Sequence, residues 1–160
     1  MRIYVLRHGI AEDASARTPD FKRELTDDGR KKLAGVLRLA RRAGVQPELV
    51  ISSPLVRALQ TAEMARECLH VDAAIQQTQA LVPESSPQKV WEELRGLRNL
   101  DAVLLAGHQP LLSDLAAWLL GAPELQIHMG KAVMVCIEVE QFRGDPHGTL
   151  RWMISPRLAE

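Results

Sequence analysis

The chain has 160 residues, and its twenty Lys or Arg residues balance twenty Asp or Glu residues, so the formal net charge is zero. A chain without a basic surplus is a poor match for nucleic acid or an anionic membrane, and we expect neither as a partner. The length suits one domain over residues 1–160, and Cys68 and Cys136, which are far apart, are typical of reduced thiols in a cytoplasmic protein.

Short apolar runs and polar stretches alternate in the first part of the chain. Residues 3–6 form a continuous apolar run that predicts a buried strand and is too short for a signal or membrane segment. Residues 9–24 are polar and aperiodic, which predicts a long loop of the kind that often carries function. Thr26 then has the position of a helix N-cap, and Gly44 is placed to end that helix.

The next elements repeat the order of strand and helix. Residues 49–51 predict a second buried strand, and a helix should follow to about residue 68. We expect Ser52 or Ser53 to cap this helix, with Pro54 near its first position. Beyond it, the sequence predicts a loop at 82–87, a helix that starts at Ser86-Pro87 and a buried strand at 102–106. A further helix should run from Pro110 to Gly121, and two further strands should follow at 133–139 and 149–154.

The alternation of strands and helices predicts an α/β fold. We expect a three-layer sandwich, in which a mixed sheet with a parallel centre carries helices on both faces. Apolar residues alternate over 133–139, so this strand should be half buried, and 149–154 should return beside it as an antiparallel edge hairpin.

Polar residues gather where the predicted strands end. Arg7 and His8 follow the first strand, Arg57 lies in the first turn of the helix after the second, and His108 follows the strand at 102–106. Ligands of open α/β sheets bind beyond the carboxyl ends of the strands, so these four side chains can converge on one site. Two guanidiniums, two imidazoles and a helix N-terminus favour a phosphoryl group as the ligand.

The chemistry expected of this site is nucleophilic catalysis. An unprotonated imidazole nitrogen can attack phosphorus and form a phosphohistidine, which divides one difficult displacement into two easier ones. His8 is the better nucleophile, because Arg7 precedes it and Gly9 leaves room for the backbone to turn beside a phosphate. Arg7, Arg57 and a protonated His108 would then neutralise the phosphoryl oxygens.

Four sequence motifs, in this order, resemble those of the histidine phosphatase superfamily. They are Leu6-Arg7-His8-Gly9, Leu25-Thr26-x-x-Gly29, Ser53-Pro54-x-x-Arg57-Ala58-x-Gln60-Thr61 and Gly107-His108. The resemblance covers nearly the whole chain and implies a phosphoglycerate-mutase-like fold, His8 as nucleophile, and Arg7, Arg57 and His108 as catalytic and phosphate-binding residues. It implies no cofactor, and no cluster of side chains has the spacing of metal ligands.

Within the superfamily, the chain is short and resembles the SixA-type phosphohistidine phosphatases. Its length, the loop at Val82-Pro83 and the C-terminal Trp152-x-x-Ser155-Pro156 carry this resemblance. It implies removal of phosphate from histidine on a phosphorelay protein, with a histidine-containing phosphotransfer domain as the partner. A small-molecule phosphomonoesterase on the same scaffold is the alternative, and a non-catalytic phosphate or phosphoprotein binding module is a third. The sequence is compatible with a monomer.

Glu84 and the charged residues of the first loop have more than one interpretation. In acid-assisted members of the superfamily, a carboxylate beyond the second arginine motif protonates the leaving group, and Glu84 lies in the corresponding loop. It is equally compatible with a plain loop residue before Ser86. The charged residues of the first loop are expected to be solvated rather than catalytic: Glu12, Asp13, Arg17, Asp20, Lys22 and Arg23.

Overall fold

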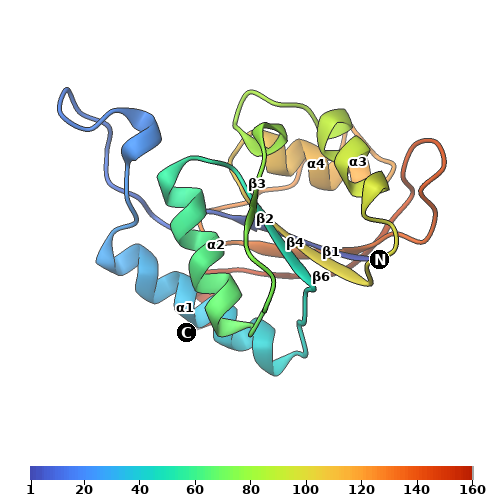
Figure 1. Ribbon diagram of the computed structural model, residues 1–160, viewed down its shortest axis with the longest axis horizontal. Helices are drawn as coiled ribbons and strands as arrows, with labels where there is room; N and C mark the ends of the chain where they lie inside the picture. The colour runs from blue at the N-terminus through green and yellow to red at the C-terminus, as the bar shows by residue number, and fades with distance from the viewer. Residues whose placement is uncertain (160) are drawn as a thin grey trace.

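A six-stranded mixed sheet lies between helices on both of its faces in the computed structural model, which describes residues 1–159 (Figure 1). The elements in chain order are β1 Arg2–Arg7, η1 Asp20–Lys22, α1 Asp27–Arg42, β2 Leu49–Ser52, α2 Val56–Cys68, β3 Gln76–Gln77, η2 Gln79–Leu81, α3 Pro87–Gly96, β4 Ala102–Gly107, α4 Leu111–Leu119, β5 Met134–Glu138, β6 Thr149–Ile154 and η3 Pro156–Leu158, where η marks a 3-10 turn. Within residues 1–159, none of the helices combines the length and the apolar character needed to cross a membrane.

The strand order is β3-β2-β4-β1-β5-β6, and the pairing confirms the expected mixed sheet. β4 pairs in parallel with β1 on one side and with β2 on the other, so Arg7 lies opposite Gly107 and Ser52 opposite Ala106. β5 runs antiparallel to β1, and β6 antiparallel to β5, which gives the expected antiparallel edge. The carboxyl ends of β1, β4 and β2 therefore lie at one level, where the polar residues that follow these strands meet.

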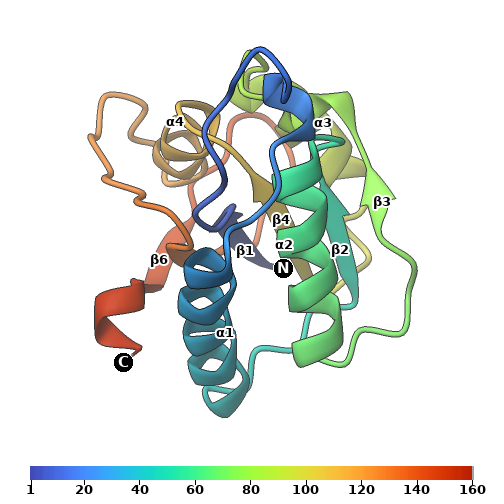
Figure 2. The same ribbon diagram turned by 90° about the vertical axis from the view of Figure 1, so that its left-hand side faces the viewer.

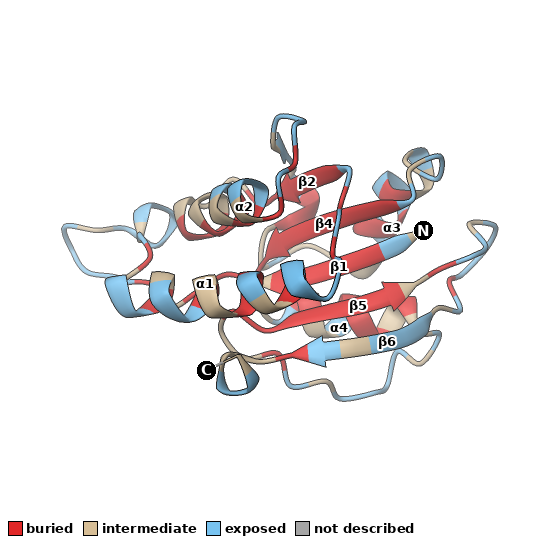
Figure 3. Cartoon of the chain, turned by 90° about the horizontal axis from the view of Figure 1, so that it is seen from below, coloured by how far each residue is buried: buried red, intermediate tan, exposed pale blue. Residues whose placement is uncertain are grey.

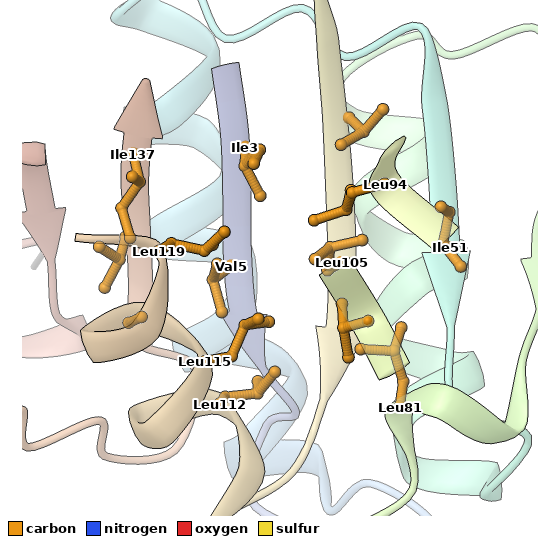
Figure 4. Close-up of a cluster of buried hydrophobic side chains, with 14 of the residues drawn as sticks. Ile3, Val5, Ile51, Leu81, Leu94, Leu105, Leu112, Leu115, Leu119 and Ile137 are labelled. Carbon is orange, nitrogen blue, oxygen red and sulfur yellow. The ribbon is translucent and has the colours of Figure 1, made fainter. Parts of the chain in front are cut away.

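Side chains of the central strands point alternately to the two faces, which divides the apolar core in two. Ile3 and Val5 face the layer formed by α3 and α4. Figure 4 shows Leu115 and Leu119 of α4 beside Val5, and Leu94 of α3 beside Leu105 of β4. Tyr4 and Leu6 face the other layer, formed by α1 and α2, which lie side by side in Figure 2. Each fully buried leucine in these two layers stabilises the fold by roughly 2 kcal/mol. The helices on both faces of the sheet are therefore held by apolar packing.

The expectation of a half-buried strand at 133–139 is wrong. In β5, Met134 to Ile137 are all buried, and only Glu138 is partly exposed. The strand lies inside the sheet, and on its side of the sheet the exposed edge is β6, as Figure 3 shows. The residues between the alternating valines and isoleucine include Met134 and Cys136, which are apolar and pack on the second face. The apparent alternation was therefore a continuous apolar run, as a strand buried on both faces requires.

The start of α2 also differs from expectation, because no serine caps it. The helix begins at Val56, two residues after Pro54, and its N-cap Leu55 has no side-chain hydrogen bond. The Ser53 hydroxyl instead accepts the backbone N–H of Leu55 at 3.3 Å and lies 2.8 Å from a ring nitrogen of His108. Ser53 is therefore not the helix cap, and its hydroxyl contacts His108 instead.

The start of α1 confirms the expected cap and ties the helix to the first loop. The Thr26 hydroxyl accepts the N–H of Gly29 at 3.0 Å, and the Thr26 N–H donates to the Ile10 carbonyl at 2.9 Å. Gly29 lies so close to this carbonyl that a Cβ atom there would be 2.1 Å from the Ile10 oxygen. Glycine is therefore required at this position by a close backbone approach, and the residues just after His8 are fixed against α1.

We expect Gly29→Ala to lower the free energy of unfolding by about 2 to 3 kcal/mol, because overpacking against a rigid backbone must displace the chain. Urea denaturation measures the change. Gly96→Ala is the matched control, because a Cβ atom at Gly96 meets nothing within 4 Å. It should leave stability unchanged or raise it slightly. Equal stability of the two variants would contradict the close contact at Ile10.

Candidate functional site

The predicted site residues Arg7, His8, Arg57 and His108 lie together at the carboxyl end of the parallel strands. Arg7 ends β1 and His8 follows it, His108 follows β4, and Arg57 is the second residue of α2. A backbone hydrogen bond of 3.0 Å from His8 N–H to the Gly107 carbonyl extends the β1–β4 pairing to the site. The two imidazole rings lie 5.1 Å apart between centroids.

The backbone carbonyl of the next residue holds His8 in one tautomer. Its Nδ1 lies 2.7 Å from the Gly9 carbonyl oxygen, which can only accept, so Nδ1 carries the proton and donates. Nε2 is then the nitrogen with the lone pair, and it accepts the Nε–H of Arg57 at 3.3 Å. His8 is 4% exposed. The unprotonated nitrogen of a buried imidazole is thus turned toward a guanidinium.

Arg57 is buried and uses each of its nitrogens. Besides the Nε–H bond to His8, its Nη1 donates to the Asp20 carbonyl oxygen at 2.9 Å, and its Nη2 donates to Asp20 Oδ2 at 3.2 Å. Burial lowers the pKa of Arg57, and the Asp20 carboxylate opposes that shift. The guanidinium therefore bridges the His8 imidazole and an acidic residue of the first loop.

Arg7 and His108 each have one buried polar atom without a partner among the described residues. Arg7 Nη1 donates to the Met129 carbonyl at 2.8 Å, whereas its Nε–H is buried and makes no hydrogen bond. His108 Nε2 bonds Ser53, whereas its Nδ1 is buried and unpaired. Buried polar atoms are seldom left unsatisfied without a functional reason. These two atoms are the natural hydrogen-bonding groups for a ligand.

Both histidines are neutral in the free protein. The pKa of His8 is lowered to about 2, chiefly by burial; the bond to Gly9 opposes this shift, and the charges of His108, Lys131 and Arg57 act in the same direction as burial. Burial also lowers the pKa of His108 to about 3, with Arg57 and Arg7 acting in the same direction. The expected protonated His108 is therefore not the form of the free site, because a buried imidazole among guanidiniums does not hold a second positive charge.

Gly9 allows a close approach of the chain at the start of α1. A Cβ atom at Gly9 would lie 3.2 Å from Leu25 Cδ2 and 3.3 Å from the Gly29 carbonyl oxygen. Its N–H donates to the Thr61 hydroxyl at 3.2 Å. The glycine thus makes room for the start of α1 and for a contact with α2, and it fixes the carbonyl that orients His8.

Two charged residues of the first loop reach the site, contrary to the expectation that they are merely solvated. Asp20 bonds Arg57, and Arg23 donates from Nε and Nη2 to Asp20 Oδ1 at 2.9 and 2.7 Å. Partial burial raises the pKa of Asp20, but the bonds and charges of Arg23 and Arg57 outweigh it and lower that pKa overall. In the sequence, the acidic Asp20 follows Pro19 and lies three residues before the basic Arg23. This pattern is typical of a turn closed by an ion pair, and it could have indicated that this part of the loop is structured.

Lys131 is a further positive group that sequence reasoning missed. Burial lowers the pKa of Lys131, and Arg7, Arg23 and Arg57 lower it further, which places its charge among those of the site. It follows Gly130 in the loop before β5, where the Ala132 N–H donates to the His8 carbonyl at 3.1 Å. No periodicity or motif marks this loop, so only the fold brings it to His8.

Glu84 is exposed, in the loop between η2 and α3. Its negative charge acts on Arg57, raising the pKa of that guanidinium slightly against the larger effect of burial. Glu84 therefore lies on the rim of the site and makes no hydrogen bond to the imidazoles. Among the residues the structure describes, no three His, Cys, Asp or Glu side chains are grouped as metal ligands.

Comparison with known proteins agrees with this arrangement. Residues 3–82 match the sequence model of the histidine phosphatase superfamily, branch 1. An uncharacterised protein of Picosynechococcus is 33% identical over 120 residues, which cover 74% of this chain and 70% of that one. The phosphohistidine phosphatase SixA of Escherichia coli is 28% identical over 159 residues, 98% of this chain and 94% of that one. A structure of the protein histidine phosphatase SixA complexed with tungstate superposes with a TM-score of 0.89 at 25% identity, covering 100% of both chains.

The contact between Asp20 and Arg57 leads to a prediction about anion binding. An incoming oxyanion must compete with the Asp20 carboxylate for Arg57, so Asp20→Asn should tighten the binding of tungstate. An ion pair with one exposed member contributes up to about 1 kcal/mol, which corresponds to about fivefold in the dissociation constant. Isothermal titration calorimetry measures this constant.

Asp13→Asn is the matched control for Asp20→Asn. Asp13 is exposed in the same loop and its charge acts on Lys131, but it makes no bond to Arg57. Its removal should change tungstate binding by less than about twofold, as expected for a screened surface charge. Weaker binding in Asp20→Asn than in the wild type would show that Asp20 orients Arg57 for the anion instead of competing with it.

Proposed function

Because the chain belongs to the histidine phosphatase superfamily, we propose that it removes phosphate from phosphohistidine on a protein, with His8 as the nucleophile. The observation that carries the proposal is the hydrogen bond from His8 Nδ1 to the Gly9 carbonyl at 2.7 Å. This bond keeps the proton on Nδ1 and leaves the Nε2 lone pair available for attack on phosphorus. The low pKa of His8, about 2 because of burial, keeps the ring unprotonated at neutral pH.

The reaction has two displacement steps. In the first, the lone pair of His8 Nε2 forms a bond to phosphorus while the bond from phosphorus to the leaving group breaks, and the leaving group takes the electron pair. In the second, a water oxygen attacks the same phosphorus, the bond to Nε2 breaks, and phosphate leaves with the water's proton transferred to the solvent. In the free site, Arg57 Nε–H donates a hydrogen bond to His8 Nε2 at 3.3 Å. This bond must break before the Nε2 lone pair can attack.

The positive groups around His8 supply the binding and transition-state stabilisation. The guanidiniums of Arg7 and Arg57 are positively charged, and their planar shape allows each to bind two phosphoryl oxygens at once. A phosphoryl oxygen that takes over the Arg57 N–H groups from His8 and Asp20 would free the nucleophile at the moment of binding. Neutral His108 adds a donor, and a bound dianion would itself favour protonation of this ring.

The choice of phosphohistidine as substrate is supported by the relatives and by the chemistry of the leaving group. SixA of Escherichia coli and the structure of SixA with tungstate each match this chain over nearly its full length. An imidazole leaving group accepts a proton from water near neutral pH and needs little help from the enzyme. Neither Arg57, which bonds His8, nor His108, whose ring lies beside it, is a carboxylic acid, which suits such a substrate. The partner is a phosphorylated protein with a histidine-containing phosphotransfer domain.

A small-molecule phosphomonoesterase is the second candidate, and Glu84 is the observation that favours it. Its carboxylate lies on the rim and its charge acts on Arg57. A protonated Glu84 could supply the proton that an alkoxide leaving group needs. A phosphate-binding module without catalysis is the least supported role, because binding alone does not need an unprotonated nitrogen on His8.

We extend the proposal to the whole chain and its setting. Residues 1–160 would form one domain, which is supported by β5 and β6 joining the sheet that carries the residues matched to the superfamily. The reaction would need no metal, because Arg7 and Arg57 already provide the positive charge. A cytoplasmic location suits Cys68 and Cys136, which are both free thiols.

We expect a covalent phosphohistidine at His8. Rapid quench of the wild type with ³²P-labelled phosphohistidine protein should give a label on this chain that is labile in acid and stable in base. His8→Ala should give no label and lose at least about a thousandfold in rate, because the nucleophile is gone. His70→Asn, which changes an exposed histidine away from the site, should keep both label and rate. Normal turnover by His8→Ala would refute the mechanism.

Glu84→Gln separates the two candidate substrates. For a phosphohistidine phosphatase, the change should lower the rate on phosphohistidine by less than about tenfold, and the wild type should hydrolyse alkyl phosphates poorly. General-acid help for an alkoxide is worth about a hundred- to ten-thousandfold. Steady-state rates on a phosphohistidine protein, an alkyl phosphate and an aryl phosphate measure the difference. Brisk hydrolysis of alkyl phosphates that disappears in Glu84→Gln would establish the monoesterase instead.

A further inference from the structure

Ser53 is a buried polar residue whose hydroxyl touches the second histidine of the site. Its Oγ lies 2.8 Å from His108 Nε2, and the two residues are 0% and 1% exposed. The other partner of this hydroxyl is the Leu55 N–H, which donates to it at 3.3 Å. Within the described chain, His108 Nε2 is therefore the sole acceptor in reach of the Ser53 O–H proton.

The direction of this hydrogen bond decides where His108 carries its proton. If Ser53 donates to Nε2, the proton of the neutral ring is on Nδ1, and every polar group of the pair except the Nδ1–H has a partner. If Nε2–H donates to Ser53, the buried hydroxyl proton loses its acceptor, and Nδ1 is left as an unpaired acceptor as well. The first arrangement leaves one buried group unsatisfied and the second leaves two, so the first is favoured.

We propose that Ser53 is a positioning residue that holds the His108 proton on Nδ1, so that this nitrogen donates a hydrogen bond to a phosphoryl oxygen. The inference rests on the phosphoryl site proposed above. Without Ser53, the neutral ring could place its proton on Nε2 and present a lone pair to the negatively charged oxygen, which repels it. The hydroxyl thus selects the form of His108 that attracts the substrate.

The hydrogen-bond partners of His8 and His108 favour different tautomers of the two rings. The Gly9 carbonyl accepts from His8 Nδ1 and leaves a lone pair on Nε2, as a nucleophile needs. The Ser53 hydroxyl donates to His108 Nε2 and leaves an N–H on Nδ1, as an anion-binding group needs. Both rings are neutral, and their pKa values are lowered chiefly by burial, so the choice between them is a choice of tautomer and not of charge.

The adjacent serine provides a matched control. Ser52 is also 0% exposed, and its hydroxyl donates to the Ser53 carbonyl at 2.8 Å without touching His108. Ser52→Ala and Ser53→Ala therefore remove the same group from neighbouring buried positions at the end of β2, and only the second changes the surroundings of His108.

The first test reads the tautomer directly and needs no substrate. In the full chain labelled with ¹⁵N-histidine, long-range ¹⁵N–¹H correlation spectra at pH 7 distinguish a protonated from an unprotonated ring nitrogen. Assignment uses His108→Gln. We expect His108 to be protonated on Nδ1 in the wild type and in Ser52→Ala, and to shift toward protonated Nε2 in Ser53→Ala. A wild-type ring protonated on Nε2 would overturn the proposal, as would an unchanged tautomer in Ser53→Ala.

The second test measures turnover of phosphohistidine protein. Loss of a well-placed donor in the transition state costs at least about tenfold, so Ser53→Ala should lower kcat by that factor with little change in KM. Ser52→Ala should stay within about threefold of the wild type. If Ser53→Ala fails to fold, Ser53→Cys keeps a weak donor of similar size and should give an intermediate rate and tautomer ratio. Equal rates for Ser52→Ala and Ser53→Ala would refute the positioning role.

The two tests separate this inference from the proposed function. A wild-type protein with no phosphatase turnover would refute the function, while the spectrum would still report the His108 tautomer. A wild-type enzyme with turnover but with His108 protonated on Nε2 would refute the inference about Ser53 and leave the function standing.

Discussion

The parallel pairing of β1 with β4 is the constraint on which the site depends. It places Arg7 opposite Gly107, so the residues that follow the two strands, His8 and His108, leave the sheet side by side. The pairing of β4 with β2 adds Ser53, whose N–H donates to the Ala106 carbonyl at 3.0 Å, and the helix that carries Arg57. Parallel strands need long crossovers, and here the crossovers supply the helices that bury both faces of the sheet. A one-residue slip in either pairing would move His8 or Ser53 away from His108, so the register that fills the core also assembles the chemistry.

Concentrating positive charge at the end of a sheet has a cost that the surrounding structure offsets. Two arginines lie beside two buried imidazoles, with Arg23 and Lys131 contributing further charge, although the chain as a whole is neutral. Backbone carbonyls of Met129 and Asp20 accept from Arg7 and Arg57, and the Asp20 carboxylate forms an ion pair with Arg57. Because buried cations cannot be left without acceptors, the loops at 9–24 and 120–133 fold over the strand ends. These loops therefore define the size and charge of the site.

Small neighbouring groups, and not the histidines themselves, assign the histidines their roles. The Gly9 carbonyl leaves a lone pair on the free ring nitrogen of His8, and the Ser53 hydroxyl leaves an N–H on the free ring nitrogen of His108. Burial makes this assignment strict, because in a water-excluded site each hydrogen bond has no substitute. Close backbone packing supports it in turn: Gly9 and Gly29 allow the first loop, α1 and the Gly9 carbonyl to approach one another.

The sequence by itself determined the layered α/β fold and the four residues at the centre of the site, because motif residues at the ends of apolar runs fall on one edge of a parallel sheet. It also determined the Thr26 cap, since capping is a local interaction. It could not show that β5 is an interior strand, because a run of apolar residues does not reveal which neighbours pair with it. Nor could it bring Asp20 to Arg57 or the loop of Lys131 to His8, or turn Ser53 from a helix cap toward His108. Asp20 and Arg57 are 37 residues apart and Ser53 and His108 are 55 residues apart. Only the tertiary structure decides such contacts, since they arise from strand order, loop closure and the hydrogen-bonding needs of buried charges.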